Sequence, residues 1–181
     1  MDGCQKLTIP TIDPNMLIDE IKTTFRDIPP GRHPRPSCCA PKNYIAYGES
    51  ERLEYLEGKA WLEIAENVIY MRRHAIDQFL GMKKQCFFYL LPGYLIGATV
   101  HPPESTAHVT QSLLCILVVN TALEDIRRYV FNRLTVSQKR AVAHWLLLVL
   151  RRDQDRCPEL YIDGATPSLA LWTFRDWQQW A

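Results

Sequence analysis

The sequence has no cluster of glycines, no long apolar run and little strand pattern. Its eight glycines are scattered along 181 residues, which excludes a glycine-rich phosphate loop. The longest apolar stretch, residues 86–100, is shorter than the ~20 residues of a membrane-spanning helix. Alternation with a period of two, rich in Val, Ile and Thr, is nearly missing. These absences favour an all-α protein.

An excess of charge of one sign is also missing. The net charge is +1, the charged fraction is 23% and the hydrophobic fraction is 47%, which is the balance of a globular domain. We therefore expect neither a nucleic acid nor a membrane as an obligatory partner. The first residues, Met-Asp-Gly-Cys-Gln-Lys, contain no apolar segment of a secretory signal, so the expected location is cytoplasmic. The six cysteines should then be reduced.

Helix signals divide the chain into about seven or eight helices. Asp13-Pro14 predicts a helix start, because a carboxylate can cap it and proline suits its first position. An apolar stripe follows at helical spacing: Leu17, Ile21, Phe25 and Ile28. Residues 59–80 contain neither Gly nor Pro, and their apolar spacing predicts a further helix.

Two later segments have the spacing of a capping box, in which the first and fourth side chains bond to each other's backbone N–H. They are Thr121–Glu124 and Thr135–Gln138. Two such signals so close together predict an antiparallel pair of helices. The whole chain, 1–181, is predicted to form a single compact all-α domain with its helices packed in antiparallel pairs.

The stretch Cys86 to Val100 is predicted to lie at the centre of the core. Since proline cannot donate a backbone hydrogen bond, we expect Pro92 to separate two buried helical pieces and to open the second. The side chains predicted to be least accessible are Phe88, Leu91, Leu95 and Trp145.

Two segments look suited to contact a partner. Residues 29–48 form a proline-rich basic loop that carries Arg32 and Arg35. Residues 166–181 predict a C-terminal helix with Thr166 as N-cap and Pro167 at its first position. Aromatic and arginine side chains supply most of the energy of many interfaces. The candidate partner-binding residues are Arg32, Arg35, Trp172, Arg175, Trp177 and Trp180. Docking of the tryptophans onto the protein's own core is the competing interpretation.

No residue pattern predicts a catalytic, cofactor or metal site. His101 and His108 have no accompanying carboxylate cluster, and adjacent Cys38-Cys39 do not fit the ligand spacing of a zinc site with His33. Cys86 and Cys115 lie in apolar runs, where burial would make a thiol inert. The basic pairs of the sequence show no aromatic interleaving and predict solvated helix faces. These pairs are Arg72-Arg73, Lys83-Lys84, Arg127-Arg128 and Arg151-Arg152.

Three segments carry a resemblance to a known family. They are Trp61-Leu-Glu-Ile, the stretch Phe88 to Leu95 with its aromatic-Leu-Pro-aromatic pattern, and Leu134-Thr-x-x-Gln138-x-x-Ala-Val. Together they resemble a bacterial family of small all-helical proteins catalogued as a domain of unknown function. The resemblance spans roughly residues 50–152. It implies a helical fold and brings no catalytic residue.

The function hypothesis is a non-catalytic protein-interaction module, most plausibly an immunity or inhibitor protein that neutralises a bacterial toxin domain. Its partner would be a protein, possibly a toxin domain encoded next to it, and the chain would be a monomer or small homo-oligomer without a cofactor. Two alternatives stay open. One is an enzyme whose site is dispersed in the sequence, which a cleft holding a histidine and a carboxylate with strongly shifted pKa values would favour. The other is a weak nucleic-acid binder, whose affinity would fall steeply with salt.

Overall fold

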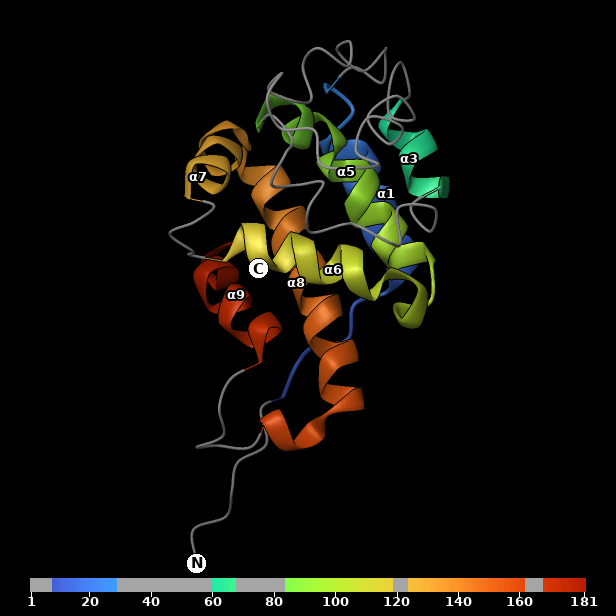
Figure 1. Cartoon of the computed structure of the whole chain (residues 1–181), viewed down its shortest axis with the longest axis vertical. Helices are drawn as coiled ribbons and strands as arrows, with labels where there is room; N and C mark the ends of the chain where they lie inside the picture. The colour runs from blue at the N-terminus through green and yellow to red at the C-terminus, as the bar shows by residue number, and fades with distance from the viewer. Residues whose placement is uncertain (1–7, 29–59, 68–83, 119–123, 162–167) are drawn as a thin grey trace, which may run out of the picture.

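The computed structural model describes residues 8–28, 60–67, 84–118, 124–161 and 168–181 (Figure 1). Within these ranges the chain forms seven α-helices, two short 3-10 helices and no strand. The α-helices are α1 (Pro14–Thr24), α3 (Trp61–Asn67), α5 (Lys84–Val100), α6 (Pro103–Leu117), α7 (Glu124–Arg133), α8 (Val136–Arg156) and α9 (Leu169–Trp177). The 3-10 helices are η4 (Pro158–Tyr161) and η5 (Gln178–Trp180). The predicted all-α fold is confirmed.

One hydrophobic cluster joins all seven α-helices. It includes Leu17 of α1, Ile64 of α3, Val130 of α7 and a large part of α5, α6, α8 and α9. Figure 1 shows α6 running across the view and α8 running down it, with α9 against them on one side. Within the described residues, no helix is both long and apolar enough to cross a membrane.

Helix α1 begins where Asp13-Pro14 predicts. The Asp13 carboxylate accepts hydrogen bonds from the backbone N–H groups of Asn15 and Met16, at 2.8 and 3.3 Å. The apolar stripe that starts at Leu17 is buried as far as Ile28. The dipeptide therefore fixed the start of the helix through its capping chemistry.

Helix α8 begins with the predicted capping box and is tied to α1. Thr135 Oγ1 accepts from the Gln138 N–H at 3.2 Å, and Gln138 Oε1 accepts from the Thr135 N–H at 3.0 Å. The Gln138 amide also donates to the Thr24 carbonyl at 3.1 Å. Glu20 and His144 form a second link between these helices, with 2.8 Å between Oε2 and Nδ1. Thr121, of the other predicted box, lies outside the described residues.

The prediction of a break at Pro92 is wrong, because α5 runs through it as one helix. Every residue from Tyr89 to Thr99 is buried. An interior proline costs about 3 kcal/mol, whereas burying one large apolar side chain contributes about 1.5–3 kcal/mol. Burial on both sides of Pro92 therefore outweighs the lost hydrogen bond. Leu91, Leu95 and Trp145 are fully buried as predicted, while Phe88 is only partly buried and packs against Tyr129.

The last helix begins later than predicted. The N-cap of α9 is Ser168, whose Oγ accepts from the Leu171 N–H at 3.2 Å, and Leu169 is the first helical residue. Serine caps a helix as well as threonine does, so Thr166-Pro167 gave a plausible signal two residues too early. Of the predicted helix over residues 59–80, the structure describes Trp61–Asn67 as helical.

Candidate interaction surface

Helix α9 is anchored to the protein by one of its tryptophans. Trp177 is 1% exposed, and its indole Nε1 donates to the Leu117 carbonyl at 3.0 Å. Leu117 ends α6, so the indole satisfies a carbonyl that has no partner within its own helix. The Trp177 ring also meets Phe131 of α7 edge to face, with centroids 5.3 Å apart. Trp177 therefore belongs to the core and offers no surface to a partner.

Trp172, unlike Trp177, is exposed to solvent. Its side chain is 60% exposed, which makes it one of the few large hydrophobic residues on the described surface. Arg175 is exposed one turn later on the same helix, and residues three apart are neighbours on a helix surface. The anchored helix thus presents an aromatic ring beside a guanidinium group.

The exposure of Trp180 is intermediate between that of Trp177 and that of Trp172. Trp180 is partly buried in η5, 6.3 Å from the Phe131 ring centroid, and Lys139 Nζ lies 4.7 Å from its own ring. Its indole Nε1 has no hydrogen-bond partner within the described part of the chain. The structure therefore separates the three tryptophans into a buried anchor, a partly covered ring and an exposed ring. Arg32 and Arg35 lie outside the described residues.

Basic side chains lie beside aromatic rings over α7 and the start of α8, and one of them, Lys84, belongs to a basic pair that we expected on a solvated face. Lys139 Nζ lies 4.0 Å from the Phe131 ring centroid. On the other side of α7, the Tyr129 ring has Arg133 at 4.1 Å and Lys84 at 5.3 Å. The contacts of Lys139 and Lys84 join residues from different helices, so spacing in the sequence gave no sign of them, whereas Arg133 and Tyr129 lie one turn apart on α7.

The pair Arg127-Arg128, in contrast, shares one local carboxylate. Arg127 Nε and Arg128 Nη2 lie 3.0 and 3.2 Å from the Glu124 carboxylate. The hydrogen bond from Arg127, followed by that from Arg128, lowers the pKa of Glu124. Arg128 lies on the solvated helix face that the sequence predicts, whereas Arg127 is partly buried.

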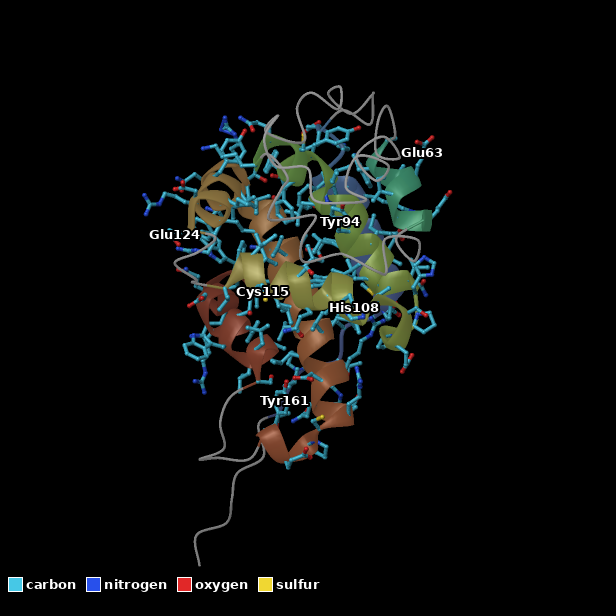
Figure 2. All side chains as sticks on the ribbon, in the orientation of Figure 1. Glu63, Tyr94, His108, Cys115, Glu124 and Tyr161 are labelled. Carbon is cyan, nitrogen blue, oxygen red and sulfur yellow. The ribbon has the colours of Figure 1, made fainter. Side chains whose placement is uncertain are left out.

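A separate pocket of about 220 Å³ lies between α6, α8 and the start of α9. Asp153, Tyr161 and Ser168 form a hydrogen-bonded chain beside it: the Tyr161 hydroxyl donates to Asp153 Oδ2 at 2.6 Å and lies 2.9 Å from Ser168 Oγ. Figure 2 shows Tyr161 beside the end of α8. Burial, followed by the bond to Asp153, raises the pKa of Tyr161 well above its usual range. The proton therefore stays on the tyrosine, and this chain fastens the start of α9 to α8.

A second pocket, between α1, α3 and the end of α5, is lined by His101 together with Asp19 and Glu66. No histidine lines the pocket between α6, α8 and α9. Burial raises the pKa of the Cys115 thiol, which weakens it as a nucleophile. His108 is exposed on α6 and His101 is partly buried at the end of α5. The described residues contain no group of three or more His, Cys, Asp or Glu side chains placed to hold a metal ion.

The fold and this surface define an all-α protein with an anchored, tryptophan-bearing C-terminal helix. The model of the "Family of unknown function (DUF6714)" matches residues 15–174, and the chain belongs to this family. The predicted resemblance to a family of unknown function is thereby confirmed. No curated protein matches the chain, and no solved structure does.

Proposed function

We propose that this protein is a non-catalytic protein-interaction module, and that it is an immunity protein which binds and neutralises a toxin domain encoded beside it. The observation that carries the proposal is Trp172, 60% exposed on a helix that is itself anchored by Trp177. Tryptophan and arginine are the residues most often found at the energetic centre of interfaces. Trp172 and Arg175 would be such a centre.

Anchoring of α9 favours tight binding. A flexible helix would lose conformational freedom on binding, and this loss would reduce the affinity. Helix α9 is held at one end by Ser168 and Tyr161 and at the other by Trp177. Trp172 is therefore presented on a backbone that is already ordered. In this proposal Trp180, Arg32 and Arg35 add to the rim, and the protein acts in the cytoplasm as a monomer or small homo-oligomer.

Co-expression with the product of the neighbouring gene tests the proposal. The expected result is a stable complex and rescue of growth by this protein. Trp172→Ala combined with Arg175→Ala should weaken the complex by 2 kcal/mol or more, about thirtyfold in Kd. Met16→Ala is the matched control, because Met16 is 73% exposed on α1. A harmless neighbour, or a toxic neighbour that stays unbound, would sink the immunity proposal.

Weak binding of nucleic acid is a second candidate, favoured by the rings and cations around Tyr129 and Phe131. Aromatic platforms beside basic side chains are used by proteins that bind single strands. The expected signature is an affinity for a single-stranded oligonucleotide that falls steeply between low and high salt and is reduced by Arg133→Gln. Unchanged affinity in this variant would remove the candidate. A dispersed enzyme site remains the other alternative.

A further inference from the structure

The pocket between α6, α8 and α9 has the composition of a binding site. One stripe of α6 forms one wall, with Thr110 and Leu114 among its residues. One stripe of α8, with Val149, Arg152 and Arg156, also lines the pocket, as does Leu169 of α9. Apolar groups and a few polar groups that converge on one cavity are typical of sites for small molecules.

The charges in this pocket do not cancel. Arg152 and Arg156 contribute two guanidinium groups and Asp153 one carboxylate. The Asp153 carboxylate is occupied by the Tyr161 hydroxyl at 2.6 Å. Within the described residues, neither arginine forms an ion pair, whereas Arg151 on another face of α8 pairs with Asp155. The pocket therefore keeps an excess of one positive charge.

Arg152 is fixed in place and partly withdrawn from water. Its Nη1 and Nη2 donate to the carbonyls of Ala98 and Thr99 at the end of α5, both at 2.9 Å. A guanidinium has five N–H donors, so three remain for another acceptor. Burial lowers the pKa of Arg152 because the charged form loses hydration. An anion in the pocket would compensate that loss.

The size of the pocket limits the ligand. A volume of about 220 Å³ is smaller than that of most drug-sized sites. With about 30 Å³ for a water molecule in the liquid, it holds on the order of seven to ten non-hydrogen atoms. A benzoate ion has this size, and it combines an anionic head with an apolar body.

We propose that this pocket binds a small organic anion, with its carboxylate or phosphate head towards Arg152 and Arg156 and its apolar part against Leu114, Val149 and Leu169. Thr110 offers a hydroxyl as a further donor to the head. The pocket has both guanidinium groups and apolar side chains, so its ligand should have an anionic head and an apolar part. Guanidinium matches the geometry of both carboxylate and phosphate. This site is independent of the proposed contact through Trp172.

Calorimetric titration of the full chain with benzoate, phenyl phosphate and benzamide tests the proposal. Benzamide has nearly the shape of benzoate without its charge. We expect saturable binding of benzoate or phenyl phosphate with a Kd of about 1 mM or tighter, and binding of benzamide at least tenfold weaker. The comparison of the two anions decides which head group the site prefers.

Two variants at exposed positions locate the binding without disturbing the core. Arg156→Gln removes one charge, and Ala107→Phe fills the pocket from the α6 side; each should weaken binding at least tenfold. Arg140→Gln is the matched control, since Arg140 is exposed on α8 outside the pocket. Circular dichroism checks that the variants fold. Benzamide binding as tightly as the anions, equal affinity in all three variants, or no saturable binding of either anion would each overturn the proposal.

Discussion

At Gly93 the lack of a side chain decides how closely two helices approach. A Cβ atom at this position would overlap the Trp61 carbonyl oxygen and lie 3.3 Å from the Ile64 Cβ. Helix α3 therefore packs directly on the backbone of α5. The glycine beside Pro92 is explained by this contact and not by a turn.

We expect Gly93→Ala to lower the free energy of unfolding by about 1–3 kcal/mol, because overpacking displaces α3. The higher helix propensity of alanine, about 1 kcal/mol, opposes this effect and does not cancel it. Val100→Ala, at a position 57% exposed on the same helix, should stay within about 0.5 kcal/mol. Urea unfolding measures both changes. A more stable Gly93→Ala variant would mean that α3 packs elsewhere.

Tyr161 is the residue for which the structure predicts an effect of pH. Its pKa is raised in the folded state by burial and by the hydrogen bond to Asp153. As the pH rises above the ordinary tyrosine pKa of about 10, the unfolded chain releases this proton before the folded protein does. Stability should therefore be complete below that pH and decrease above it.

Tyr161→Phe should remove this part of the alkaline loss. Near neutral pH it should also lower the free energy of unfolding by about 1–3 kcal/mol, since Asp153 and Ser168 lose a buried partner. Denaturant unfolding of both proteins at about pH 8 and at about pH 11 provides the measurement. Burial also raises the pKa of Tyr89 and Cys115, so the variant keeps some alkaline sensitivity. An identical dependence on pH in the two proteins would show that Tyr161 is exposed.

At the scale of the helix, the two residues of the α8 capping box are not equivalent. Thr135 acts only at the start of α8, whereas Gln138, 5% exposed, also donates to the Thr24 carbonyl of α1. Thr135→Ala should cost about 1 kcal/mol. Gln138→Ala should cost about 2 kcal/mol, because a second hydrogen bond is lost.

Ser137→Ala, exposed in the same turn, is the control for helix propensity and should change stability by no more than about 0.5 kcal/mol. Thermal and urea unfolding of the three variants show which substitution lowers stability most. Equal losses for Thr135→Ala and Gln138→Ala would show that the link to Thr24 contributes nothing in solution.

Helix starts could be predicted from the sequence where the chemistry is local. Asp13 and Thr135 bond to backbone N–H groups within three residues, so their neighbours in sequence define them. The effect of Pro92 could not be predicted in this way. It depends on α3 and other helices that pack on α5, and these contacts come from distant parts of the chain.

The two candidate sites, the Trp172 surface and the pocket between α6, α8 and α9, differ in the same way: one is built from residues close in sequence and the other from residues far apart. Trp172 and Arg175 are three residues apart, and a helical pattern already groups them. The pocket, however, joins residues near 106, 152 and 169, and its partners come from three helices. Spacing in the sequence gives no sign of such a cavity, because only the packing of the helices brings Arg156 and Thr110 to one pocket.

At the scale of the whole molecule, α9 determines whether the C-terminus is part of the cooperative fold. Trp177 connects it to α6 through Leu117 and to α7 through Phe131. Trp177→Phe removes the bond to the Leu117 carbonyl and part of a buried ring. We expect a loss of about 2–4 kcal/mol in the free energy of unfolding.

The loss should affect the whole protein, since the single core includes residues of α9 together with those of the other helices. Amide exchange in Trp177→Phe should therefore become faster in α5 and α8 as well as in α9. Trp172→Phe is the matched control; it should leave stability within about 0.5 kcal/mol, because this ring is 60% exposed. Faster exchange confined to α9 would show that this helix opens by itself. Trp172 would then not be held on a rigid support, and the argument for tight binding through an ordered helix would fail with it.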